Sequence, residues 1–391
     1  MQIPQLAHRI FRALLSLKLA ITCLALLMVL VVACTLAQVE MGTHGAVNLF
    51  MRSFVVWWRP PGWTTSLPVL PGGALVGMVL GVNLVAAQLV RLERSWRKVG
   101  LWLVHLGLIL LVLAEFISAA LQVDARMEIE EGQTLDFVER PLDFELLLVD
   151  TADPQLDDVY GIPESRLRAG ELIAVPGTPI TLKIHDFLQN TAMRRREAKD
   201  PPGLANRGVG TGVVLTEAPP VSADDMRNEP AVYVEPIANG KSYGIWTVAA
   251  GLGAPQQFVH EGRTYQLKMR PRRDYLPYHL TLKKFSHDVY AGTDIPKNFS
   301  SLVHLVNPQT HEERDVLIFM NQPLRYLGRT FYQASFGKND TLSVLQVVEN
   351  PGWLLPYISC ALVTIGLLMH FAITLGRSQR KRQRRTQEAV V

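Results

Sequence analysis

The sequence predicts a membrane protein with four transmembrane α-helices and a large all-β extracytoplasmic domain, built as a sandwich or an open barrel. Three observations predict this fold class. The chain of 391 residues is 48% hydrophobic and only 19% charged. Its apolar residues are concentrated in four long runs. The long segment before the last run instead alternates apolar and polar residues in short stretches, which is typical of strands.

Four apolar runs are long enough to cross a membrane. A bilayer core of about 30 Å requires roughly 20 predominantly apolar residues in a helix. The runs lie at 19–37, 70–90, 99–121 and 353–375. They divide the chain into an N-terminal membrane domain with three spans (1–121), an extracytoplasmic β-rich domain (122–352), and a fourth span with a basic cytoplasmic tail (353–391).

Basic residues predict the orientation of these spans, because Lys and Arg near span ends favour the cytoplasmic side. Under four crossings, three basic clusters fall on one side: Arg9, Arg12 and Lys18; Arg91, Arg94, Arg97 and Lys98; and RSQRKRQRR at 377–385. Both termini are therefore expected in the cytoplasm, with 38–69 and 122–352 outside. The net charge of +4 mostly reflects these clusters and does not indicate nucleic-acid binding.

The outward segments carry strand and interface signals. Runs such as PITLKIHDF, AVYVEPI and RTFYQASF are rich in β-forming residues and are separated by Gly, Pro, Asn and Asp. The charged, Pro/Gly-rich stretch 193–208 is expected to be a loop. Trp57, Trp58 and Trp63 fit an interfacial anchor, although a tryptophan pair can also form a flat surface for a planar cofactor.

Several classes of enzyme are not supported. Cys23, Cys34 and Cys360 all lie in predicted spans, so the outward domain has no cysteine for a disulfide, a thiol reaction or a thiolate metal site. The sequence has no CxxC, GxSxG or nucleotide-binding motif. We therefore assign no catalytic residue.

His105 is the main candidate functional residue. It lies in the apolar run LWLVHLGLILLVLAEF, about 10 Å inside the cytoplasmic boundary at Lys98. Ionisable residues at this depth are costly and are functional candidates by default. Three roles are open: a hydrogen bond to a neighbouring helix, a step in a proton relay, or an axial ligand to a metal or haem.

Two further ionisable residues lie within the spans. Glu115 is ten residues after His105, about 15 Å along a helix and roughly 80° away in azimuth, so the two side chains cannot touch. Glu115 is expected to reach water or an outward arginine. His370, near the inner end of the fourth span, is expected at the interface.

Several segments resemble the ResB (CcsB) family, a component of System II cytochrome c biogenesis. LLSLKLAITCLALLMVLVVACTLAQ resembles the first span of the family, and VRLERSWRKVGLWLVHLGLILLVLAEF resembles its cytoplasmic turn and third span, with the histidine in place. YAGTDIPKNFSS, NQPLRYLGRTFYQASFG and SVLQVVENPGW resemble its closing strands. We interpret NQPL and YQASF as mainly structural, with contact to a partner as the alternative.

The resemblance implies a subunit of a cytochrome c haem lyase complex in the bacterial cytoplasmic membrane, without activity alone. It also implies that the chain works with a ResC (CcsA)-type membrane partner to carry haem b across the membrane and attach it to exported apocytochrome c. His105 would be an axial ligand to the haem iron, with the second ligand supplied by the partner.

Two other functions are compatible with the residues. One is a membrane-anchored chaperone or assembly factor that holds apocytochrome c and does not bind haem. The other is a transporter subunit in which His105 and Glu115 carry protons, which their poor helical alignment disfavours.

Overall fold

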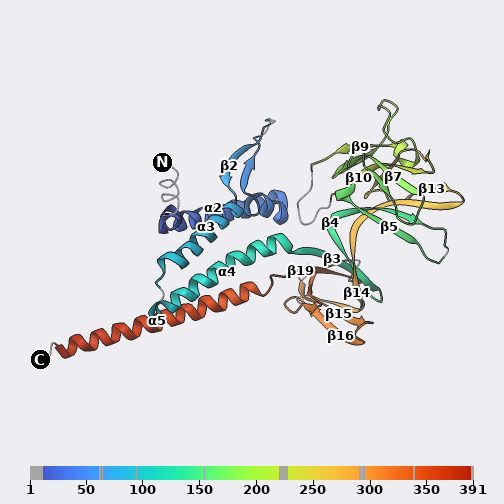
Figure 1. Ribbon diagram of the computed structural model, residues 1–391. Coiled ribbons are helices and arrows are strands. Elements are labelled where there is room, and N and C mark those ends of the chain that lie inside the picture. Colours follow the sequence, from blue (N-terminus) through green and yellow to red (C-terminus); the bar gives the residue numbers. More distant parts are fainter. Residues whose placement is uncertain are drawn as a thin grey trace. The chain divides into compact units, whose positions relative to one another are not determined.

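The described chain forms two compact units. The computed structural model describes residues 12–60, 63, 65–93, 95–153, 155–219, 228–289, 292, 296–337 and 340–388. Arg9 and Arg94 of the predicted basic clusters lie outside these residues. One unit comprises Met1–Val123 with Glu349–Val391, and the other comprises Asp124–Val348. Helices dominate the first unit and strands the second (Figure 1).

Among the described residues of the first unit, four helices are long and apolar enough to cross a membrane. They span Leu17–Met51, Gly73–Arg91, Trp96–Leu121 and Leu355–Gln383. Each overlaps one of the four predicted runs. In the most apolar 18-residue stretch of each helix, only 11% to 28% of the residues are buried. Most of these side chains are therefore available to lipid or to a partner. The predicted fold class of four apolar helices and a β-rich domain is confirmed.

The first helix, α2 (Leu17–Ala46), is interrupted at Gly42, whose φ of 70° is readily adopted by glycine. The chain then continues into the π-helical turn η1 (Val47–Met51). An antiparallel hairpin of β1 (Val55–Trp58) and β2 (Leu67–Pro71) follows, with Trp57 and Trp58 exposed. The predicted span 70–90 therefore begins within β2.

The remaining helices pack through small residues. They are α3 (Gly73–Ala86) with the π-helical turn η2 (Ala87–Arg91), η3 (Trp96–Lys98), α4 (Val99–Leu121) and α5 (Leu355–Glu388). A Cβ atom on Gly107 of α4 would lie 2.7 Å from Val363 Cγ2 and 2.8 Å from the Ser359 carbonyl oxygen of α5. Glycine therefore allows the two backbones to approach closely, as in many membrane helix pairs.

The second unit contains a ten-stranded sheet. Its main path runs β16-β15-β14-β4-β3-β19-β18-β17, with β13 on β14 and β5 on β4. The strands are β3 (Val123–Glu130), β4 (Thr134–Asp150), β5 (Asp158–Pro163), β13 (Gln256–His260), β14 (Arg263–Val289), β15 (Pro296–Asn307), β16 (Glu312–Phe319), β17 (Leu324–Tyr326), β18 (Arg329–Gly337) and β19 (Leu342–Glu349).

A five-stranded sheet and a short hairpin complete the unit. The sheet runs β11-β10-β7-β6, with β12 on β10, and the hairpin pairs β8 with β9. These strands are β6 (Leu172–Ala174), β7 (Ile180–Leu188), β8 (Thr191–Arg195), β9 (Val213–Glu217), β10 (Ala231–Ala238), β11 (Lys241–Ser242) and β12 (Trp246–Ala249). The short helices are η4 (Glu164–Arg166) and η5 (Gly208–Gly212).

Two hydrophobic cores divide the β unit into two lobes. The first lobe is centred on the five-stranded sheet, and the second is enclosed by β3 and β14 to β19. The long strands β4 and β14 contribute to both cores. Where they pass between the lobes, two ion pairs join them: Arg140 to Asp274 at 2.6 Å and Arg273 to Glu139 at 2.9 Å. These ion pairs therefore connect β4 and β14 where the two strands lie between the two hydrophobic cores.

Candidate functional site

His105 occupies the second turn of α4 and is half-buried. Its Nδ1 atom lies 2.9 Å from the carbonyl oxygen of Leu101. Because a carbonyl only accepts, Nδ1–H is the donor there, and in the corresponding neutral tautomer Nε2 carries a lone pair. Nε2 has no hydrogen-bond partner among the described residues. A histidine that ligates a metal commonly has this arrangement, with the other ring nitrogen fixed by a carbonyl.

The ring lies on the side of α4 that faces α3. At 100° per residue, His105 is about 140° around the helix from Gly100, which contacts α5. Phe116 and Val112 share the side of His105. Phe116 comes within 3.7 Å, and Val112 within 3.4 Å, of the Cβ positions of Gly77 and Gly81 on α3.

The structure does not bring His105 together with the other ionisable residues of the spans. Glu115 is exposed further along α4. The backbone of His370 lies against Gly100, where an added Cβ would be 2.6 Å from the His370 nitrogen, and is therefore on the α5 side. This geometry gives the predicted proton-relay alternative no direct route between these side chains.

Two buried amides, one in α3 and one in the π-helical turn η2 that follows it, were not identified from the sequence. Gln88 is buried, and its Nε2 donates to the Trp102 carbonyl of α4 at 3.3 Å. Asn83 is also buried, and its Nδ2 donates to the carbonyl oxygens of Leu14 and Ser16. The signal in the sequence was the presence of a neutral amide within an apolar run, because an amide is costly to bury without a hydrogen-bond partner.

Several histidines of the β unit have separate acidic partners. His185 Nε2 is 2.7 Å from Glu235, and His304 Nδ1 is 2.7 Å from Asp315. Asp315 also accepts from Lys283, and that hydrogen bond, followed by the one from His304, lowers the pKa of the Asp315 carboxyl. Within the described ranges, no group of three His, Cys, Asp or Glu side chains could hold a metal ion.

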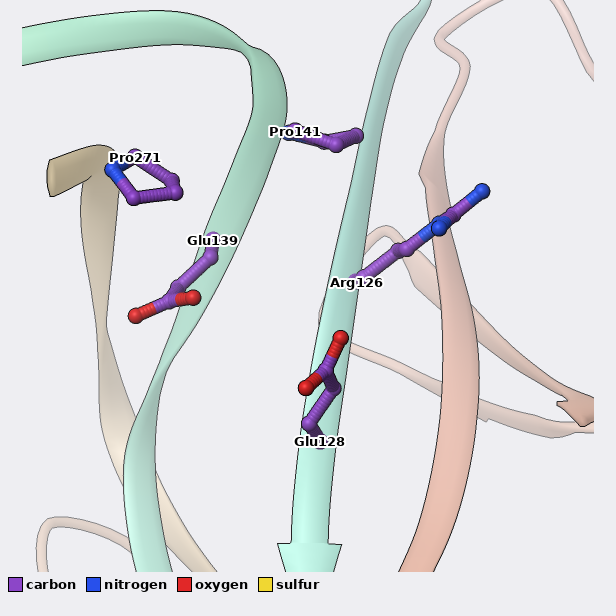
Figure 2. Close-up of a pocket in the computed structure, with 5 residues that line it drawn as sticks. All are labelled: Arg126, Glu128, Glu139, Pro141 and Pro271. Carbon is purple, nitrogen blue, oxygen red and sulfur yellow. The ribbon is translucent and has the colours of Figure 1, made fainter. Parts of the chain in front are cut away.

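A pocket lies between β3, β4 and β14 near the crossing of the lobes. It is lined by Arg126, Glu128, Glu139, Pro141 and Pro271 (Figure 2). Its volume is about 200 Å³, including space open to solvent. Small-molecule sites are typically about 300–1,000 Å³ and mostly apolar. This pocket therefore does not fit a porphyrin, and its lining contains no histidine.

Gln333, within the YQASF motif, has a structural role. It is buried on β18, and its Oε1 accepts from Ser301 Oγ at 2.6 Å, while its Nε2 donates to Ser343 Oγ at 3.1 Å. Ser301 and Ser343 are fully buried on β15 and β19. The three side chains therefore link strands of the second lobe across its core.

Comparison with known proteins finds a match in the C-terminal part of the β unit. Residues 238–344, from the end of β10 to the start of β19, match the model of the ResB-like family. The predicted resemblance to ResB is confirmed. A relative, Protein NrfI of Wolinella succinogenes, is 33% identical over 114 residues. That alignment covers 27% of this chain and 13% of the length of NrfI. The ResB-like segment thus includes Gln333 and its network, whereas His105 lies outside it.

Proposed function

We propose that this chain is the ResB-like subunit of a System II cytochrome c biogenesis machinery. It helps to carry haem across the membrane and, with a ResC/CcsA-type partner, to attach the haem to exported apocytochrome c. The observation that carries this proposal is the match of residues 238–344 to the ResB-like family. The four apolar helices support a membrane location, here assigned to the bacterial cytoplasmic membrane.

In this proposal haem b is cargo, and His105 holds it in transit. The Nδ1–H bond to Leu101 fixes the ring and leaves Nε2 available to iron. Imidazole is a common axial ligand of haem iron, and apolar side chains around it limit water. The second axial ligand comes from the partner.

The proposed orientation places both termini in the cytoplasm. Arg91 supports the inner end of the bundle by donating to the Leu15 carbonyl at 2.7 Å, and Lys98 pairs with Glu93 at 2.8 Å. Basic side chains near span ends favour the cytoplasmic side. The β unit then faces outward, where exported apocytochrome c is matured.

Reconstitution tests this function against the haem-free chaperone. The full chain, a ResC-type partner and an apocytochrome c reporter are produced together in cells lacking their own biogenesis system. We expect covalent holocytochrome with the unaltered chain and an at least tenfold loss with His105→Ala, because one ligand is missing. His370→Ala is the matched control, since this histidine lies on the α5 side.

Binding of the apocytochrome c reporter distinguishes haem handling from the chaperone function. If His105→Ala retains the reporter in pull-downs but does not attach haem, the result supports haem handling. Full holocytochrome yield with His105→Ala would contradict the ligand role and favour the chaperone.

A further inference from the structure

Gln88 carries a buried acceptor without a donor. The side chain is 6% exposed, and its Nε2 donates to the Trp102 carbonyl. That bond fixes the orientation of the amide, because a carbonyl cannot donate to Oε1. Oε1 is buried and has no partner in the described part of the chain. Native proteins rarely leave such an acceptor unpaired, so a donor that the described residues do not supply is expected there.

The contacts between α3 and α4 place Gln88 level with His105. Gly77 lies against Phe116, and Gly81 lies against Val112. The two helices therefore run antiparallel, and an advance of four residues along α3 matches a step of four residues back along α4. Seven further residues lead from Gly81 to Gln88, and seven residues back from Val112 lead to His105. Seven residues are about two helical turns, so both side chains keep the facing sides of their helices.

The backbone at Gln88 is also unusual. Gln88 lies in the π-helical turn η2, which the amide of Leu92 closes on the Ala87 carbonyl at 3.1 Å. Single π-helical turns are rare and are often found at functional sites. Trp102, the acceptor for Gln88, is one turn before His105 in α4. The amide therefore holds the turn that presents the imidazole.

We propose that Gln88 is a positioning residue of the His105 haem site, an inference that rests on the proposed function. Its Nε2 fixes the turn of α4 that carries His105, and its Oε1 accepts a hydrogen bond from an O–H donor that arrives with the haem. The donor is either a protonated carboxyl group of the porphyrin or a water molecule. No bond of the haem is made or broken in this step.

The test uses the full chain purified together with its ResC-type partner. Gln88→Leu removes the donor and the acceptor at similar size, whereas Gln88→Glu, when protonated, keeps an O–H donor and a carbonyl acceptor. Asn83→Leu is the matched control, because Asn83 is a buried amide of α3 that donates to Leu14 and Ser16 instead. Each protein is titrated with haem and with haem dimethyl ester, and the absorption spectrum and midpoint potential are recorded.

We expect Gln88→Leu to weaken haem binding about tenfold, the effect of losing one hydrogen bond to a ligand, and to shift the Soret band and potential. Gln88→Glu should restore both signals, and Asn83→Leu should leave them unchanged. If the effect of Gln88→Leu disappears with the dimethyl ester, the donor is the porphyrin carboxyl group. If it persists, the donor is water.

Two results would overturn the inference. One is a Gln88→Leu protein with unaltered affinity and spectrum, and the other is an Asn83→Leu protein with the same shift. If His105→Ala loses haem while Gln88→Leu does not, only the role of Gln88 fails. If the unaltered complex does not bind haem, the proposed function fails as well.

Discussion

A polar ring at lipid depth needs compensation for the water that it has lost. In His105, the Leu101 carbonyl satisfies one ring nitrogen, and the other remains open. A role limited to joining neighbouring helices would place a hydrogen bond between helices, yet this bond stays within α4. The single internal bond therefore favours a ligand over a structural link, because the remaining nitrogen is still available.

The ion pair between Asp200 and Arg194 leads to a prediction about pH. Asp200 accepts a bidentate pair of hydrogen bonds from Arg194, both at 2.7 Å, and one from the Glu197 amide at 2.8 Å. The Arg194 bonds, followed by the Glu197 amide, hold the pKa of the Asp200 carboxyl well below its usual range. These bonds organise the Pro/Gly-rich stretch 193–208, which the sequence predicts as a loop but whose first three residues belong to β8.

Because this pKa is lowered on folding, its stabilising effect is present above the unfolded value near about 3.9 and is lost as the pH falls further. We expect the Glu197 amide to be equally protected from hydrogen exchange at about pH 7 and about pH 5, after correction for the intrinsic rate. Asp200→Asn should reduce this protection at both values. Protection that falls between these two pH values, or that survives the substitution, would contradict the ion-pair account.

The contact between α4 and α5 depends on glycines, which have no side chain. Gly100 and Gly107 on α4 and Gly366 on α5 each approach backbone atoms of the other helix within 3.0 Å of an added Cβ position. Backbone atoms cannot move aside as a flexible side chain can. A larger residue must therefore separate the helices, and with them the turn that carries His105.

Gly107→Leu tests this contact. We expect it to destabilise the helix pair by about 1–3 kcal/mol through overpacking, lowering the midpoint of thermal unfolding of the full chain in detergent. Gly376→Leu is the control, because no atom lies within 4 Å of the Cβ position of that α5 glycine. Equal midpoints for the two variants would show that the close approach is not needed for stability.

Over the whole molecule, local signals predicted the helices better than the strand pairing. The four spans follow from apolar length, but the break at Gly42 and the hairpin of β1 and β2 were not visible. Short apolar runs such as VVWW and LPVLP have no period that distinguishes a strand from the start of a span. The pairing of β4 with β14 joins Tyr265 to Asp150, residues more than a hundred positions apart, and alternation alone cannot identify such partners.

The candidate site was predicted only in part, for a similar reason. His105 is conspicuous because an ionisable residue at lipid depth is rare. Gln88 is neutral and close to the basic cluster at Arg91, so its burial emerges only when α3 is placed against α4. The role of His105 in holding haem stays a prediction.

The most direct test is the absorption spectrum of the purified full chain, recorded with and without the proposed ResC-type partner. We expect a Soret band for the unaltered protein, its loss in His105→Gly, and its return when free imidazole occupies the vacated position. A His105→Gly protein with unchanged haem content, or an unaltered chain without a Soret band under either condition, would contradict the ligation of haem by His105.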